Sequence, residues 1–162
     1  MSRSGADLAL LLLGGFRSLV QSAQDELARR GYEDVRPVHD FAIRAIAAGA
    51  DSASDLGRRT GVTKQSAART ITVLQERGYV SREADPSDAR RKRLCVTQRG
   101  FDMLRAGEAI FDDLRERWAR EIGPDRLTEL ESDLTALVGR DAVRADAPGW
   151  IAAEDLVEPT ER

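Results

Sequence analysis

The chain has 162 residues, of which 41% are hydrophobic and 33% are charged, and its formal net charge is −3 at pH 7. This length allows one domain or two small intimate ones, and an aromatic content of only 5% beside so many charges is typical of a helical protein with long solvated faces. A single cysteine excludes an internal disulfide and fits a reducing cytosol, so a cytoplasmic protein is expected. One histidine and one cysteine are too few for a zinc site, and we expect no metal or other cofactor.

The first 31 residues predict a long amphipathic helix. Its apolar positions recur at helical spacing: Leu8, Leu11, Leu12, Phe16, Leu19, Val20, Ala23 and Leu27. The leucine run is too short to span a membrane and Arg17 follows it closely, so neither a membrane segment nor a secretion signal is predicted. The pair Gly14-Gly15 weakens a helix, which is easier to accept where two helices approach closely. The pair therefore points to an interface or a cavity.

A second helix is expected to begin at Pro37, because proline suits the first helical position, and to end at Gly49. Its predicted buried face consists of Val38, Phe41, Ala42, Ala45 and Ile46. His39 stands at the start of this helix, where we expect a partly exposed surface or interface residue.

The next two helices predict a helix-turn-helix. Ser52 or Ser54 can cap a short helix that ends at Gly61, where glycine permits a left-handed conformation. Thr63 then caps a helix over residues 64–77, whose buried face would hold Ala67, Thr70, Ile71 and Leu74. The other face of its N-terminal end is short or polar and carries two cations: Lys64, Gln65, Ser66, Ala68 and Arg69. A glycine turn followed by such a helix is the arrangement that enters the DNA major groove.

A basic hairpin follows, with strands predicted at residues 79–82 and 93–97. Val80, Leu94 and Val96 would face inward. The loop between the strands holds the turn formers Asp85, Pro86, Ser87 and Asp88 and the consecutive cations Arg90, Arg91, Lys92 and Arg93. A solvated loop has no need of four cations, whereas a loop that straddles a phosphate backbone does.

Cys95 lies between two inward-facing residues of this hairpin and therefore points away from the buried face. The cations beside it are expected to lower its pKa and raise its reactivity. Strand geometry is nevertheless favoured over redox sensing as the reason for a cysteine at this position.

The segments LGRRTGVTKQSAARTITVLQERGYVSR and DPSDARRKRLCVTQRG together resemble the winged helix-turn-helix core of the MarR family of bacterial transcription regulators. The most specific part is Asp88-x-Arg90, a basic run, a strand and then Thr97-x-x-Gly100. The resemblance covers residues 51–100. It implies a mainly α fold with a small β wing, in which dimerisation helices flank the winged core. It also implies a homodimeric DNA-binding regulator, with a repressor favoured, which binds a pseudo-palindromic operator of double-stranded DNA and is often released by a small ligand.

The charge distribution agrees with this interpretation. Residues 56–99 hold eleven cations and four acids, a net charge of +7, which leaves −10 on the rest of a chain whose total is −3. A basic segment is thus flanked by acidic ones. The local electrostatic field of the basic segment, not the total charge, governs its approach to phosphate.

Two further helices are expected after the hairpin. The first opens at Thr97 or Gln98, with an apolar stripe of Phe101, Leu104, Phe111, Leu114, Trp118 and Ile122. Gly123-Pro124-Asp125 ends it and starts the second, whose Leu127, Leu130, Leu134 and Leu137 have the spacing of a coiled-coil seam. Such a seam needs a partner helix, which the first helix of the same chain or of a second copy can supply.

From these patterns we divide the chain into an N-terminal dimerisation helix (1–36), a winged helix-turn-helix domain (37–100), C-terminal dimerisation helices (101–140) and an acidic tail (141–162) with a short helix at 151–157. The predicted DNA contacts are Thr63, Lys64, Gln65, Ser66, Ala68, Arg69, Asp88, Arg90, Arg91, Lys92 and Arg93. By resemblance, a pocket for an aromatic or other small apolar acid would be lined by Leu12, Phe16, His39 and Phe111.

An enzyme is not expected. The sequence has no glycine-rich phosphate loop and no Gly-x-Ser-x-Gly motif, and one histidine leaves little material for a catalytic triad. The alternative that stays open is a winged-helix module that binds protein rather than DNA. The wing discriminates between them, because a protein-binding version has no need of four consecutive cations beside a polar recognition helix.

Overall fold

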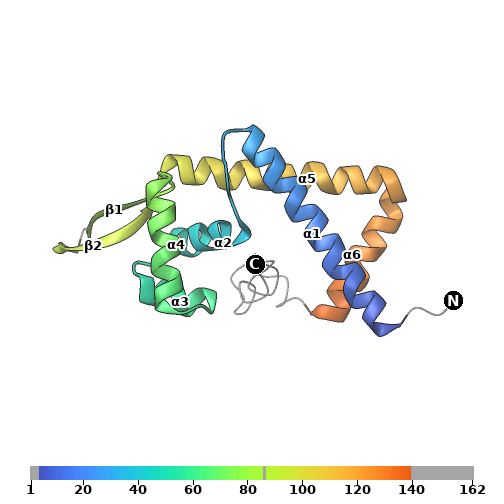
Figure 1. Cartoon of the computed structure of the whole chain (residues 1–162), viewed down its shortest axis with the longest axis horizontal. Coiled ribbons are helices and arrows are strands. Elements are labelled where there is room, and N and C mark those ends of the chain that lie inside the picture. Colours follow the sequence, from blue (N-terminus) through green and yellow to red (C-terminus); the bar gives the residue numbers. More distant parts are fainter. Residues whose placement is uncertain (1–3, 86, 140–162) are drawn as a thin grey trace, which may run out of the picture.

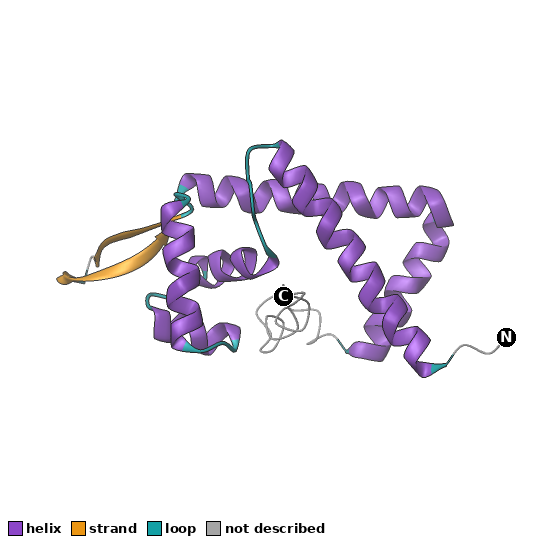
Figure 2. Cartoon of the chain, in the orientation of Figure 1, coloured by secondary structure: helices purple, strands orange, loops and turns teal. Residues whose placement is uncertain are grey.

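The computed structural model describes residues 4–85 and 87–139, apart from the side chains of residues 89 and 91. Over these residues the chain forms six helices and one two-stranded antiparallel hairpin (Figures 1 and 2). The elements are α1 (Gly5–Arg29), α2 (Pro37–Ala47), α3 (Ala53–Thr60), α4 (Lys64–Glu76), β1 (Val80–Asp85), β2 (Asp88–Val96), α5 (Gln98–Ile122) and α6 (Pro124–Val138). The predicted mainly α fold with a small wing is confirmed. The tail from residue 141 and its short helix lie outside the described residues.

Side-chain caps explain where the helices of the winged core begin. The Ser52 hydroxyl accepts the Asp55 amide at 3.2 Å, the Thr63 hydroxyl accepts the Ser66 amide at 3.1 Å, and Thr97 caps α5 in the same way. Ser52 rather than Ser54 is therefore the cap of α3. Gly61 has φ +74°, which lets the chain turn from α3 into α4.

One hydrophobic core joins the winged domain to α5 and to the second half of α1. The largest side chains that it buries almost completely are Ile43, Leu56, Ile71, Leu74, Tyr79, Met103 and Ile110. The predicted inward residues of the wing are confirmed, since Val80 and Leu94 are buried and Val96 packs against the core.

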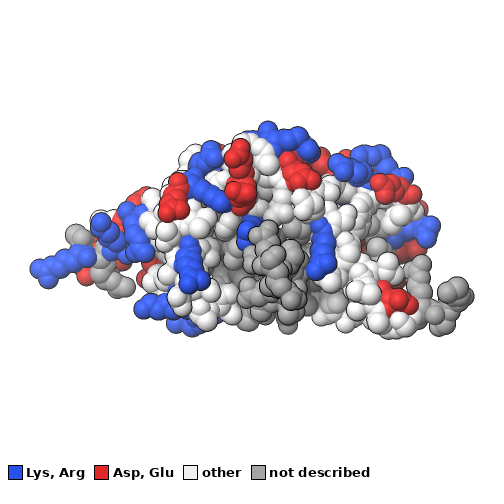
Figure 3. All heavy atoms as spheres, viewed as in Figure 1, with Lys and Arg blue, Asp and Glu red and all other residues white. Residues whose placement is uncertain are grey.

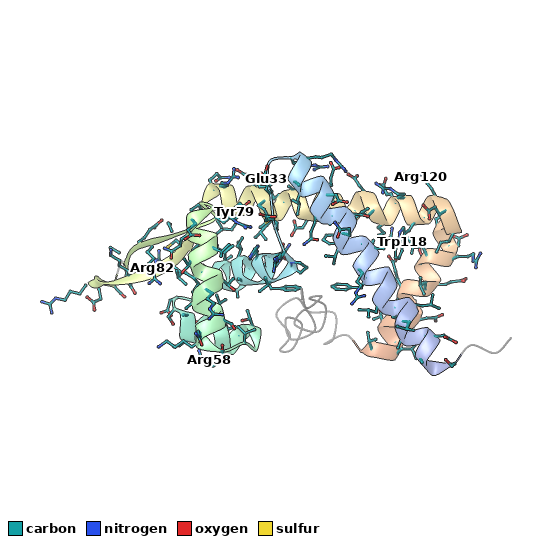
Figure 4. The ribbon with its side chains drawn as sticks, in the orientation of Figure 1. Glu33, Arg58, Tyr79, Arg82, Trp118 and Arg120 are labelled. Carbon is teal, nitrogen blue, oxygen red and sulfur yellow. The ribbon has the colours of Figure 1, made fainter. Side chains whose placement is uncertain are left out.

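Helix α5 connects the winged domain to the terminal helices α1 and α6 (Figure 1). The winged domain lies at its N-terminal end, α1 crosses it, and α6 runs back from its far end. A Cβ added to Gly15 would lie 3.7 Å from the Trp118 ring, an ordinary van der Waals distance, so the Trp118 side chain of α5 reaches α1 at this position (Figure 4). A Cβ at Gly14 would have no neighbour within 4 Å among the described residues, so the interface or cavity predicted at Gly14-Gly15 stays a prediction.

The apolar stripe predicted for α5 is only partly correct. Leu104 and Leu114 are buried, but Phe101, Phe111 and Ile122 are 39–46% exposed. The centre of the buried face is formed by Met103, Gly107 and Ile110, which are not part of the predicted stripe. The reason is that α1 and the winged core contact α5 along a face that is rotated from the predicted stripe.

In a single chain, the apolar residues on the outer parts of α1 and α6 are exposed to solvent. On α1 the exposed residues are Leu8, Leu10, Leu11, Leu12, Leu13 and Phe16, and on α6 they are Leu130, Leu137 and Val138. Leu127 is buried, so one copy covers only the beginning of the predicted α6 seam.

The strands of the wing are longer than predicted, and this corrects the position of the basic run. The ladder pairs Val80 with Val96 and continues to Ala84 with Lys92, after which an irregularity precedes the pair Asp85–Asp88. The cations of residues 90–93 therefore lie on β2, not in a loop. This polar stretch has no apolar alternation to mark a strand, and the prediction of a loop was therefore wrong here.

Candidate nucleic-acid interface

The N-terminal half of α4 presents its polar side chains to solvent. The predicted contact residues Thr63, Lys64, Gln65, Ser66, Ala68 and Arg69 are all exposed, whereas Ala67, Ile71 and Leu74 fix the opposite face in the core. This end of the helix also carries free amide hydrogens and the positive end of the helix dipole, which favour an anion. The Thr63 hydroxyl already accepts the Ser66 amide and keeps its own hydrogen for a further acceptor.

The wing beside α4 exposes the second set of predicted contacts, Asp88, Arg90, Lys92 and Arg93. Arg91 belongs to the same prediction, but its side chain lies outside the described part of the structure. The Asp88 carboxylate accepts the Arg90 amide at 3.0 Å, as expected for a residue that braces the turn. Arg90 therefore extends from a fixed backbone close to the end of the hairpin.

Register separates the cations of β2 onto two faces. Lys92 pairs with Ala84 and shares its face with Arg82 and the buried Leu94, which is the face turned toward the helices. Arg93 pairs with Glu83 and lies on the other face, beside Cys95. Arg93 thus lies opposite an acidic residue of the wing, whereas Lys92 lies opposite an alanine.

Several cations of the basic segment are committed to the fold. Arg58 and Arg59 both pair with Asp55, and Arg77 pairs with Asp34. Within the described part of the chain, no carboxylate lies in ion-pair distance of Lys64, Arg69, Arg82, Arg90 or Lys92. Figure 3 shows Lys and Arg side chains gathered on the wing and on the neighbouring helix-turn-helix. All five cations are available to a polyanion.

Arg82 also belongs to this surface, although it is not among the predicted DNA contacts. It extends from β1 at the base of the wing, near the same end of the molecule as Arg58 (Figure 4). The two-residue alternation from Val80 places it on the face of Lys92, and that alternation is the signal that would have found it.

His39 is buried, with 6% of its surface exposed, so the expectation of a partly exposed residue was wrong. Its Nδ1 atom accepts the Arg36 amide at 3.2 Å and thereby satisfies a backbone donor at the start of α2. Burial, reinforced by the positive charges of Arg77 and Arg36, lowers the pKa of His39 to about 4. In this structure His39 therefore has a structural role at the start of α2.

The other three predicted pocket residues lie on the terminal helices. Leu12 and Phe16 on α1 and Phe111 on α5 are 41–47% exposed. A hollow of about 340 Å³ does lie between α1 and α5, but none of the four predicted residues lines it, and its walls carry the charged residues Asp25, Glu26, Arg29, Asp113 and Arg117. The predicted pocket stays a prediction.

The expectation for Cys95 was wrong in sign. Burial and then the neighbouring Glu83 carboxylate raise the pKa of this thiol, and Arg93 opposes them only in part. The reason is the register, which places Glu83 on the same face of the wing as Cys95.

The described helices and hairpin define a winged helix-turn-helix protein, and none of these helices is both long and apolar enough to cross a membrane. Residues 41–91 match the sequence model of the MarR family. This stretch contains α3, α4, β1 and the turn of the wing.

Solved structures resemble the fold over most of its length. A MepR variant from S. aureus bound to an oligodeoxyribonucleotide has 16% identity and a TM-score of 0.58, and the match covers 81% of this chain and 95% of that one. YusO from Bacillus subtilis has 16% identity and a TM-score of 0.64, with 84% and 98% covered. CouR from Rhodococcus jostii RHA1, bound to p-coumaroyl-CoA, has 20% identity and a TM-score of 0.57, with 86% and 97% covered. Residues 41–91 are thus similar in sequence to the MarR family of transcription regulators, and the chain shares the winged helix-turn-helix fold of these solved structures.

Proposed function

We propose that this protein is a sequence-specific DNA-binding repressor that acts as a homodimer on a pseudo-palindromic operator. One observation carries the proposal: α4 exposes its polar N-terminal half beside a basic wing, and five cations of this surface lack a carboxylate partner among the described residues. A surface that concentrates positive charge in this way suits the phosphate backbone of DNA.

The roles follow from the position of each side chain. Gln65 and Arg69 on α4 would read base edges in the major groove, where glutamine pairs with adenine and arginine with guanine. Thr63, Lys64 and Ser66 at the start of the helix would hold phosphates. From the wing, Arg90 would enter the narrow minor groove, with Lys92 and Arg93 along the backbone.

Release by a small ligand is the second part of the proposal. CouR is a protein of this fold that holds p-coumaroyl-CoA, and another MepR structure holds ethidium bromide, so an aromatic ligand is the class to test first. The exposed Leu12, Phe16 and Phe111 would form part of its site once a second copy covers the terminal helices. Such a ligand releases DNA only if it binds the two conformations with different affinity.

Selection from a pool of random DNA duplexes tests the DNA-binding function directly. The protein should enrich a pseudo-palindrome with half-sites about 10 bp apart, one helical turn. Arg69→Ala should then weaken binding to that duplex by about 1–3 kcal/mol and relax preference at one base pair in each half-site. Arg120→Ala is the matched control, because Arg120 lies at the far end of α5 (Figure 4) and should leave affinity unchanged.

Two results would overturn the proposal. If no duplex is enriched and residual binding does not depend on salt, the surface is a protein-binding one. If Arg69→Ala weakens binding to the selected duplex and to random DNA equally, Arg69 contacts phosphate and the assignment of base readout is wrong.

A further inference from the structure

The C-terminal end of α1, the C-terminal end of α4 and the N-terminal end of α5 meet at one arginine. The guanidinium carbon of Arg99 lies 5.4 Å from the ring centroid of Tyr32 and 5.3 Å from that of Tyr79. The two ring centroids are 6.4 Å apart. Arg99 also donates a hydrogen bond to the Gly31 carbonyl at 3.1 Å. A cation over two aromatic rings and on a carbonyl oxygen is held in one orientation.

Each partner of Arg99 is itself fixed to a different helix. The Tyr32 amide donates to the Leu27 carbonyl of α1, and the Tyr79 amide donates to the Leu74 carbonyl of α4, both at 2.9 Å. Arg99 lies in the first turn of α5, whose cap, Thr97, donates to the Gly78 carbonyl. Arg99 therefore links α1, α4 and α5 through its side chain.

A second arginine links the recognition helix to residues 31–36, the segment between α1 and α2. Arg77, directly after α4, donates to the Asp34 carbonyl at 2.6 Å and approaches the Asp34 carboxylate at 3.6 Å. Residues 31–36, which join α1 to α2, are thus attached to α4 and α5 by two arginine side chains. Figure 4 shows Glu33 and Tyr79 in this region, where α4, α5 and this segment meet.

We propose that Arg99, held between Tyr32 and Tyr79, is a positioning residue that fixes the recognition helix α4 relative to the terminal helices α1 and α5. The inference rests on the proposed function, because the terminal helices join the two copies while α4 reads the DNA. The angle between α4 and the terminal helices α1 and α5 then sets the distance between the two recognition helices of the dimer. Arg99 determines which half-site spacing the dimer accepts, without touching DNA.

The test uses the full-length protein and duplexes that carry the selected operator with its natural spacing or with one base pair added between the half-sites. Wild type should prefer the natural spacing. Arg99→Ala should reduce that preference by about 2- to 30-fold, the range that corresponds to loss of a cation–π interaction. The dependence of affinity on salt should not change, because a residue that touches no phosphate releases no counterions.

Three further single variants and one double variant test whether the effect is specific to the contact between Arg99 and the rings. Arg105→Ala removes an exposed arginine of the same helix that pairs with Asp102 only one turn away, and it should keep the spacing preference. Tyr32→Phe keeps the ring and should behave as wild type, whereas Tyr32→Leu should reproduce Arg99→Ala. Combining Tyr32→Leu with Arg99→Ala should add little, since both changes remove the same interaction.

The outcomes separate this inference from the function on which it rests. If wild type enriches no duplex, the proposed function fails first. Circular dichroism and thermal melting check that the Arg99→Ala variant is folded. If wild type enriches an operator and the folded variant keeps the full spacing preference, the positioning role of Arg99 is wrong, whereas the proposed function is unaffected. A lower salt slope for Arg99→Ala would show a phosphate contact and would also overturn the inference. Should Arg99→Ala fail to fold, Tyr32→Leu decides alone.

Discussion

At the scale of single residues, Gly100 shows why the end of the wing motif requires glycine. A Cβ at this position would overlap the Tyr79 carbonyl oxygen and lie 2.7 Å from Val96 Cγ1. Tyr79 is fully buried, and its carbonyl also accepts the Thr97 amide, so neither neighbour can retreat easily. The close approach of α5 to the base of the wing therefore depends on the absence of a side chain.

Gly100→Ala should destabilise the fold by about 1–3 kcal/mol, as expected for overpacking. Gly107→Ala is the matched control on the same helix, because a Cβ at Gly107 would have no neighbour within 4 Å. Alanine should stabilise α5 there by up to about 1 kcal/mol through its helix propensity. Urea unfolding of both variants at one protein concentration measures the difference, and equal effects would contradict the steric argument.

His39 makes stability depend on pH. Its folded pKa of about 4 lies below the ordinary value of 6.5, so the folded state favours the neutral ring, and the unfolded chain binds the proton first. The stabilisation is therefore complete above pH 6.5 and is lost as the pH falls from 6.5 toward 4. Urea midpoints at about pH 7 and about pH 5 should differ more for wild type than for His39→Gln, which keeps an acceptor at the helix start. Identical differences would show that other groups account for the pH dependence.

At the scale of elements, the helices of the winged core were predictable because each carries its own boundary signals. Ser52, Thr63 and Thr97 cap their helices as the sequence indicates, and Gly61 and Gly78 end them with positive φ. The outer half of the wing was not predictable, because its strands bury no apolar face and have no alternation to reveal them.

Long-range packing explains the other differences between prediction and structure. The buried face of α5 depends on the position of α1, which lies far away in sequence and cannot be read from local periodicity. The same holds for the candidate site. Local pattern found the exposed residues of α4, and the alternation from Val80 could have found Arg82. Only the strand register shows that Glu83 lies opposite Arg93.

The wing gives the prediction at this scale. Arg90→Ala should weaken operator binding strongly, and most at A·T-rich flanks, because a narrow minor groove attracts an inserted arginine. Lys92→Ala should instead lower the slope of log affinity against log salt by about 0.9 for each phosphate that Lys92 neutralises in the wild-type complex. Arg93→Ala should lower it less, since Glu83 lies opposite Arg93.

Glu83→Gln is the complementary variant, and it should strengthen binding by removing that negative charge. Fluorescence anisotropy of a labelled operator at several salt concentrations measures all four variants. If Arg90→Ala binds as tightly as wild type, the wing tip does not enter the groove. If Lys92→Ala and Arg93→Ala change the slope equally, the two faces of the hairpin do not differ in their approach to DNA.

At the scale of the whole molecule, the candidate DNA-binding surface and the exposed leucines lie at opposite ends. The winged domain carries Lys64, Arg69, Arg82, Arg90 and Lys92 on its surface, while the exposed leucines lie on the outer parts of α1 and α6 (Figure 1). A regulator that contacts two half-sites needs such a division, because the face that joins two copies must leave both recognition helices free.

We therefore expect a dimer through the terminal helices. Leu137 on α6 is 81% exposed in a single chain, and Leu11 on α1 is 54% exposed. Burial of such surface stabilises an assembly by about 25 cal/mol per Å². Sedimentation at micromolar concentration should show a dimer for wild type and a shift toward monomer for Leu137→Asp. Ser132→Asp, an exposed substitution on another face of the same helix, should remain dimeric. A wild-type monomer at this concentration, or equal dissociation of both variants, would show that the terminal helices are not the dimer interface. The proposed operator with two half-sites would then also be wrong.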